Sequence, residues 1–246
     1  MRRALLALLL LAAPANAETA LVAVAANYAA AAEAQAEAFA AASGHTITLT
    51  TGATGKLYAQ IGAGAPYDAL LSADAATPAR LEAEGKGVAG SRFGYATGAL
   101  VLWSPDPAQI GPDPVASLDA PGLRHLAIAN PDLAPYGAAA RETLQALGQW
   151  EAMQGRLVMG ENIGQTYSMV ATGAAEAGFV ALSALLAEPG GSLWRVPQEL
   201  FRPIRQEAVL LAHGAENAAA IGFLAWLKTP EAAAINARFG YGGALP

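Results

Sequence analysis

Short apolar segments alternate with longer amphipathic or alanine-rich segments along most of the chain. Residues 46–50 alternate with period two, which is typical of a half-buried strand. Because strands that alternate with helices usually pair in parallel, the pattern predicts an α/β fold with parallel sheets. The segments that predict strands are 20–26, 46–50, 69–71, 99–103, 126–129, 157–159, 178–182 and 208–212.

Turn and capping residues place helices between these strands. Gly85 and Gly148 each end a predicted helix, since glycine is common just past the last helical turn. Thr77-Pro78 and Thr229-Pro230 each join a capping side chain to a first-turn proline, which predicts a helix start. Further helices are expected from the first strand to about residue 42 and over 56–63, 137–147, 165–172 and 216–227.

Two apolar strands, 99–103 and 208–212, bracket the middle of the chain. If both cross between lobes, residues 98–207 form a lobe inserted into a first lobe. That first lobe combines residues 18–97 with residues 208–246. The pattern therefore favours a two-lobed α/β architecture.

The N-terminus is typical of an export signal. Arg2 and Arg3 precede an apolar stretch over 4–13, and Ala15-Asn16-Ala17 fits an A-x-A cleavage site. A retained anchor is the alternative, but ten residues are too short to span a bilayer. We expect residues 1–17 to be a signal peptide that is cleaved after Ala17. Because the chain has no Cys, the product would carry no lipid at a cleavage cysteine and would lie free in a periplasm.

Composition and charge exclude several classes of partner. The net charge is −6, and removal of Arg2 and Arg3 with the leader would make it −8. Such a charge disfavours nucleic acid and anionic lipid as partners. Hydrophobic residues make up 54% of the chain, but beyond the leader no uncharged apolar run approaches the length of a membrane span.

The sequence offers little for catalysis. The three histidines, His45, His125 and His213, share no metal-ligand spacing. No nucleophile elbow, zinc-protease motif, P-loop or dinucleotide-binding fingerprint is present. Residues 72–74 follow a strand but have no histidine partner nearby, so they indicate a strand end and a helix entry. The chain is therefore expected to be neither an enzyme nor a cofactor protein.

Four strand-to-helix turns share small or polar residues just before a helix. They lie at 26–28, 52–55, 135–137 and 162–164. Helix N-termini expose unpaired N–H groups and carry a partial positive charge, so several aimed at one cleft can hold an anion without Lys or Arg. Taken singly, each turn is also explained as an ordinary helix cap.

At these turns the chain resembles the periplasmic molybdate-binding proteins, the solute receptors of ABC-type molybdate importers. The resemblance covers nearly all of the chain after the leader, and the order and spacing of its motifs carry it. The matching segments are VAANY (24–28), GATG (52–55), QIGAGAPYD (60–68), LSAD (71–74), ANP (129–131), APYG (134–137), GENI (160–163) and AAEAGFV (174–180).

The resemblance implies a two-lobed, type II-like periplasmic binding protein that closes on a dehydrated tetrahedral oxyanion. By residue matching, Asn27 would donate its side-chain N–H, and Thr54 its hydroxyl and backbone N–H. Tyr136 and Ile163 would donate backbone N–H groups. The two neighbouring positions Ala26 and Ala53 complete the candidate set.

One position departs from many relatives. Where they carry a ligand tyrosine, this chain has Ala181, and the combination of Asn27 with Ala181 resembles a sub-branch of the family. Asn27 would then replace the missing donor. The resemblance further implies a membrane permease as partner, a monomer, and molybdate or tungstate as ligand without a cofactor.

Other readings remain open at the level of sequence. A receptor for ferric ion or another oxyanion shares the architecture, and five tyrosines could serve ferric ion. An exported α/β enzyme would need a nucleophile–base pair or a metal set, and a scaffold protein would not respond to an oxyanion. The five tyrosines are Tyr28, Tyr58, Tyr67, Tyr136 and Tyr167.

Overall fold

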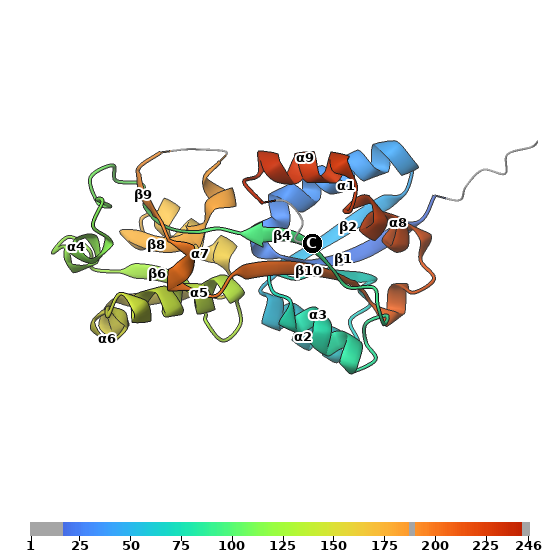
Figure 1. Ribbon diagram of the computed structural model, residues 1–246, viewed down its shortest axis with the longest axis horizontal. Helices are drawn as coiled ribbons and strands as arrows, with labels where there is room; N and C mark the ends of the chain where they lie inside the picture. Colours follow the sequence, from blue (N-terminus) through green and yellow to red (C-terminus); the bar gives the residue numbers. More distant parts are fainter. Residues whose placement is uncertain (1–16, 187–189, 243–246) are drawn as a thin grey trace, which may run out of the picture.

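The computed structural model describes residues 17–186 and 190–242, so the predicted leader lies outside the described residues except for Ala17. Two five-stranded sheets lie side by side, each covered by helices on both faces (Figure 1). None of the helices within these residues has the length and apolar character that a membrane span requires.

The first sheet has the strand order β2-β1-β3-β10-β4. β1 pairs in parallel with β2 and β3, whereas β10 is antiparallel to β3 and β4. Alternate residues of β1 face different cores: Val22 and Val24 pack with α1 and α8, and Ala23 packs with α2 and α3. The strands are β1 (Thr19–Ala25), β2 (Thr46–Gly52), β3 (Ala69–Leu71), β4 (Phe93–Gly98) and β10 (Ile204–Leu210). The helices are α1 (Ala29–Ser43), α2 (Thr54–Gly62), α3 (Ala76–Ala83), α8 (Ala218–Trp226) and α9 (Pro230–Arg238).

The second sheet has the order β7-β6-β8-β5-β9. β6 is parallel to β7 and β8, and β5 is antiparallel to β8 and β9. Its strands are β5 (Leu100–Ser104), β6 (Leu126–Ala129), β7 (Leu157–Gly160), β8 (Ala177–Ala181) and β9 (Ser192–Arg195). Its helices are α4 (Pro114–Asp119), α5 (Pro135–Ala146), α6 (Trp150–Met153) and α7 (Ile163–Ala171). Short 3-10 segments are η1 (Ala26–Tyr28), η2 (Gln154–Arg156), η3 (Leu182–Leu185), η4 (Gln198–Leu200) and η5 (Ala212–Gly214).

The predicted parallel pairing is present in both sheets, but each sheet also contains antiparallel pairs that the sequence did not indicate. The chain passes from β4 to β5 and returns from β9 to β10, and these crossing strands run against their neighbours. The strand predicted over 208–212 begins instead at Ile204, so residues 204–207 pair in the first sheet although the predicted inserted lobe reached residue 207. Residues 204–207 alternate between buried and more exposed positions, so they do not form an apolar run.

Most predicted helices are present, but several begin earlier than expected. α5 starts at Pro135 and α7 at Ile163, each two residues before the predicted start. The predicted cap at Thr229 is confirmed, since its Oγ1 accepts from the Ala232 N–H at 3.2 Å. The predicted cap at Thr77 is wrong: Thr77 lies inside α3, and Asp74 Oδ1 accepts from its N–H at 2.8 Å.

Candidate functional site

The six residues predicted for the site meet at one small cavity between the two sheets. Four chain turns converge there, two from each sheet. Residues that the sequence reasoning missed, among them Asn162 and Ala73, also line it. The lining residues are Ala25, Ala26, Asn27, Gly52, Ala53, Thr54, Ala73, Ala134, Pro135, Tyr136, Asn162 and Ile163.

The cavity lies where helices begin. β1 runs into η1 and α1, β2 into α2, β6 towards α5 and β7 towards α7. The first N–H groups of a helix have no partner within the helix, and the helix dipole places positive potential there. In open α/β sheets, ligands bind at these carboxyl ends of the strands. The cavity therefore offers N–H donors and positive potential, and no Lys or Arg lines it.

Thr54 is the first residue of α2 and is only 2% exposed. Its Oγ1 accepts from the Ala73 N–H at 3.2 Å, and Ala73 follows the end of β3. Because that bond uses an oxygen lone pair, the hydroxyl proton is left to donate. Thr54 thus faces the cavity as a hydroxyl donor whose orientation is fixed by the neighbouring strand end.

Asn27 lies differently from the expectation. Its side-chain Nδ2 donates to Gln206 Oε1 at 2.9 Å and to Tyr241 Oη at 3.2 Å. Both amide hydrogens are therefore engaged by protein groups in this arrangement. The predicted donation from the side chain to a ligand therefore has no free hydrogen in this arrangement, and the side chain fixes the turn instead.

The second sheet contributes the starts of α5 and α7. Pro135 occupies the first position of α5 and has no N–H, so Tyr136 supplies the first donor of that helix. Ile163 is the first residue of α7. Asn162 caps α7 by accepting from the Gln165 N–H at 3.0 Å. The predicted backbone donors Tyr136 and Ile163 are thus both at helix starts.

The phenol of Tyr136 is a buried group that is separate from its backbone N–H. The side chain is 2% exposed, and burial raises the pKa of Tyr136 well above its ordinary value. Among the described residues no hydrogen bond of good geometry reaches its Oη, although the nearby Asn27 amide acts to lower the pKa. It lies against Gly98, the last residue of β4, where an added Cβ would come within 2.2 Å of Oη. Gly98 therefore leaves room for the Tyr136 ring at the crossing between the sheets.

Removal of this hydroxyl is expected to stabilise the fold slightly or leave it unchanged. Tyr136→Phe deletes a buried polar atom that lacks a protein partner, so its desolvation cost disappears while the ring packing stays. We expect a change in the free energy of unfolding of less than about 1 kcal/mol, and no loss of ligand affinity. Urea unfolding of both proteins measures this. A loss of 2 kcal/mol or more would mean that the hydroxyl has a partner in solution.

Contacts between the sheets close over the cavity. The Gly55 N–H donates to Leu133 O at 2.9 Å, and Lys56 Nζ lies 3.1 Å from Glu161 Oε2. A Cβ on Gly55 would approach the Leu133 backbone to 3.1 Å, so the two segments touch closely. The structure is therefore a closed arrangement of the two sheets.

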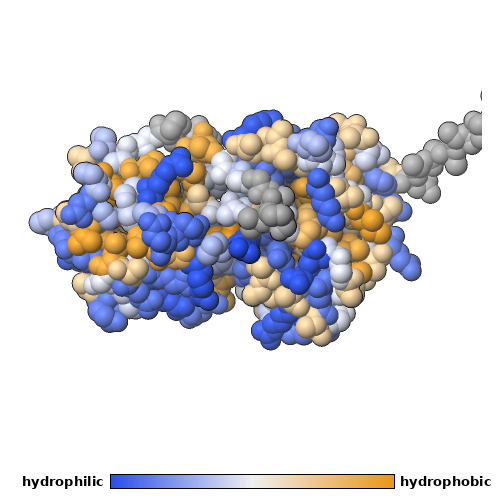
Figure 2. All heavy atoms as spheres, in the orientation of Figure 1, coloured by the Kyte–Doolittle hydropathy of each residue, from blue (hydrophilic) through white to orange (hydrophobic). Residues whose placement is uncertain are grey.

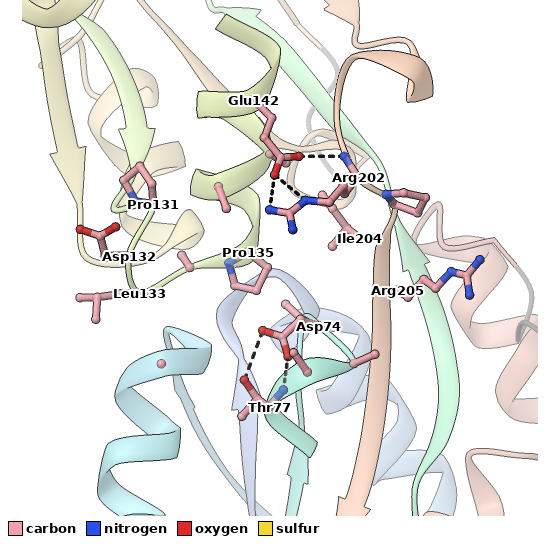
Figure 3. Close-up of a pocket in the computed structure, with 18 residues that line it drawn as sticks. Asp74, Thr77, Pro131, Asp132, Leu133, Pro135, Glu142, Arg202, Ile204 and Arg205 are labelled. Carbon is pink, nitrogen blue, oxygen red and sulfur yellow. Dashed lines mark hydrogen bonds and ion pairs between the residues drawn. The ribbon is translucent and has the colours of Figure 1, made fainter. Parts of the chain in front are cut away.

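A larger hollow of about 440 Å³ adjoins the small cavity and shares Ala73, Ala134 and Pro135 with it (Figure 3). Arg202 Nε donates to Glu142 Oε1 at 2.7 Å on one side of this hollow. Although burial acts to raise it, the pKa of Glu142 is held below its ordinary value by hydrogen bonds from Arg202. Because this pair neutralises itself, its guanidinium offers little net charge to an anion.

The alternative ligands find less support. No cluster of three or more His, Asp or Glu side chains that could hold a metal ion occurs within residues 17–186 and 190–242. His213 Nδ1 lies 2.9 Å from Asp68 Oδ1, away from the residues of the small cavity. Of the tyrosines considered for ferric ion, Tyr58 donates to Glu84 and Tyr67 to Gln60, outside the small cavity. Tyr28 packs against Tyr95 and Tyr241, and its hydroxyl donates to Asn236.

Ala181 is buried in β8, and it lines a separate hollow of about 150 Å³ beside the site. This hollow shares Ala26, Asn27 and Ile163 with the small cavity. No hydroxyl therefore reaches the site from position 181.

Residues 20–242 match the family model described as bacterial extracellular solute-binding protein. The molybdate-binding protein ModA of Rhodobacter capsulatus is 50% identical over 199 residues, which are 81% of this chain and 78% of that protein. ModA of Azotobacter vinelandii is 48% identical over 203 residues, 81% of this chain and 80% of the relative.

The fold is also shared with a solved structure. The Azotobacter vinelandii periplasmic molybdate-binding protein superposes with a TM-score of 0.87 and 40% sequence identity. The match covers 92% of this chain and 99% of that one. The resemblance of the motifs therefore extends to the whole architecture.

Proposed function

This chain belongs to the bacterial extracellular solute-binding proteins and, among them, to the molybdate-binding proteins, and on that premise we propose that it binds molybdate in the small cavity between its two sheets. It is a receptor for an ABC-type importer and not an enzyme. The observation that carries the proposal is the convergence of four helix starts on one cavity lined by no cationic side chain.

The donors suit a fully deprotonated tetrahedral oxyanion. The proposed set is the Thr54 hydroxyl and N–H, with backbone N–H groups of Asn27, Tyr136 and Ile163. Ala26 and Ala53 lie at the same turns and complete it. Every oxygen of molybdate accepts hydrogen bonds at neutral pH, so no donor meets another donor. Hydrogen phosphate carries a P–OH that would lose a bond, at a cost of about 1–3 kcal/mol.

Tungstate has the same charge and nearly the same shape, so we propose that it binds as molybdate does. Sulfate is also fully deprotonated, so donors alone do not reject it. Its smaller size would stretch the contacts in a closed, rigid cavity. Sulfate is therefore proposed as a much weaker ligand.

We also propose that the chain acts as a monomer outside the cytoplasmic membrane. Export to a periplasm, cleavage after Ala17, delivery to a membrane permease and a monomeric state follow from the leader-like N-terminus and from the family. The two sheets are proposed as two lobes, 18–97 with 208–246 and 98–207, with residues 204–207 assigned to the first sheet. Opening and closing of such lobes would admit and release the ion.

Molybdate is expected to raise the melting temperature of the purified chain. A ligand that binds only the native state adds about 2.7 kcal/mol at a hundredfold excess over its dissociation constant, which corresponds to roughly 5–10 °C for a chain of this size. Thermal unfolding with molybdate, tungstate, sulfate, phosphate and ferric citrate measures it. Shifts with molybdate and tungstate but little with sulfate are the expected result. Equal shifts with sulfate would contradict the proposed selectivity for molybdate over sulfate. A shift with ferric citrate alone would favour an iron receptor.

A further inference from the structure

We propose that Ser183 is a positioning residue that couples closure of the two sheets to the geometry of the first donor turn. Ser183 lies in η3, directly after β8 of the second sheet. Its Oγ donates to the backbone oxygen of Asn27 at 3.1 Å, and Asn27 belongs to the first sheet's ligand turn. This inference rests on the proposed oxyanion site.

Asn27, Tyr241 and Ser183 can form a closed ring of hydrogen bonds. Asn27 Nδ2 donates to Tyr241 Oη at 3.2 Å, and Tyr241 Oη lies 3.0 Å from Ser183 Oγ. Ser183 Oγ then donates to Asn27 O. Tyr241 Oη also donates to Asn27 O, in the shorter of its two donor contacts, so the single phenol hydrogen is shared between Asn27 O and Ser183 Oγ. Ser183 Oγ donates to Asn27 O wherever the phenol hydrogen lies, and the ring closes when that hydrogen turns to Ser183 Oγ.

The ring keeps its protons at neutral pH. Tyr241 is 4% exposed, and burial raises the pKa of Tyr241 to about 12. Its hydroxyl therefore remains a donor. Bonds arranged in a chain polarise one another, so loss of one member weakens the others.

Ser183 is the single member of this ring that comes from the second sheet. Asn27 follows β1, and Tyr241 packs in the core of the first sheet beside Tyr28 and Tyr95. Gln206 of β10 holds the other hydrogen of the Asn27 amide. The turn is thus fixed from its own side by Gln206 and Tyr241, and from the opposite side by Ser183. The last contact exists in the closed arrangement described here.

The Ser183 hydrogen bond should slow release of the ion without changing the rate of its capture. Encounter with an open receptor precedes formation of the ring, so the association rate should not depend on Ser183. Dissociation requires the ring to break. A neutral hydrogen bond adds about 0.5–1.5 kcal/mol, so its loss should speed dissociation by about 3- to 10-fold.

The test measures dissociation of radiolabelled molybdate, chased with unlabelled molybdate, from the wild-type chain and three variants. Ser183→Ala should release the ion about 3- to 10-fold faster, with an unchanged association rate and an unchanged melting temperature without ligand. Ser183→Thr keeps the hydroxyl, and the 150 Å³ hollow beside Ser183 has room for the added methyl, so it should restore slow release. Ser168→Ala removes an exposed helix hydroxyl that bonds its own helix and serves as the matched control.

Coupling to Tyr241 gives a second readout. If both hydroxyls act through one ring, Tyr241→Phe combined with Ser183→Ala should release the ion no faster than the faster single variant. Unchanged release from Ser183→Ala would overturn the inference while leaving molybdate binding intact. So would faster release that is matched by a lower melting temperature without ligand. Failure of the wild-type chain to bind molybdate would instead overturn the proposed function itself.

Discussion

Thr54→Val is expected to weaken molybdate binding by about 10- to 100-fold. Valine has nearly the shape of threonine, so the packing of this 2% exposed side chain is preserved while the donor is lost. A hydrogen bond to a charged acceptor adds about 1.5–3 kcal/mol, which corresponds to that range of affinity. Titration calorimetry of both proteins with molybdate measures the difference.

The same substitution should also lower stability without ligand. The Ala73 N–H loses the Oγ1 acceptor that lies 3.2 Å away, and an unpaired buried N–H costs about 1–3 kcal/mol. Thr54→Ser keeps the hydroxyl and should retain most of the affinity. Thr172→Val removes an exposed hydroxyl at the end of α7 and controls for the chemistry of the change. Wild-type affinity in Thr54→Val would show that the hydroxyl does not contact the ion.

The turns that line the cavity could be predicted because they depend on local order along the chain, and the resemblance to the family then pointed to single residues within them. An apolar strand followed by a small or polar turn and a helix places the turn at the carboxyl end of a sheet, whatever the neighbouring strands are. Asn27, Thr54, Tyr136 and Ile163 are all such residues, and all line the cavity. Asn162 belongs to the same turn as Ile163, and its capping residue type could have identified it.

The use of the Asn27 side chain could not be predicted. Its partners Gln206 and Tyr241 are 179 and 214 residues away in sequence, and no local pattern brings them together. The amide has two hydrogens to donate, but Gln206 of the crossing strand β10 and Tyr241 of the C-terminal segment accept both of them. A residue type therefore indicated a donor, while tertiary packing decided what it donates to.

Sheet edges and crossings were missed for a related reason. β4 and β9 contain polar residues, and residues 204–207 of β10 alternate in burial, so none of them forms an apolar run. These segments gain their strand conformation from pairing across the sheet, with β10 for β4 and with β5 for β9. Pairing between distant segments has no signature in the local sequence. Apart from the alternating segment 46–50, the predicted strands were accordingly short apolar runs.

Gly137→Ala is expected to lower both stability and ligand affinity strongly. Gly137 is the third residue of α5, and an added Cβ would lie 2.2 Å from Ala129 O and 2.9 Å from the carbonyl carbon of Asn130. Both are backbone atoms at the end of β6, so no side-chain rotation relieves the clash. The start of α5 must move away from the sheet, and with it the Tyr136 N–H. Overpacking of this kind costs about 1–3 kcal/mol or more.

Two measurements separate the effects on folding and on the site. Thermal unfolding without ligand should show a melting temperature lower by several degrees, since about 1 kcal/mol corresponds to roughly 2–4 °C at this chain length. The further rise on adding molybdate should shrink or vanish, because the displaced helix start no longer aims its N–H at the ion. Gly155→Ala in η2 is the matched control, because a Cβ there has no heavy atom within 4 Å. A Gly137→Ala variant that melts lower yet keeps the full molybdate shift would place the start of α5 outside the ligand contacts, leaving Thr54, Asn27 and Ile163 to hold the ion.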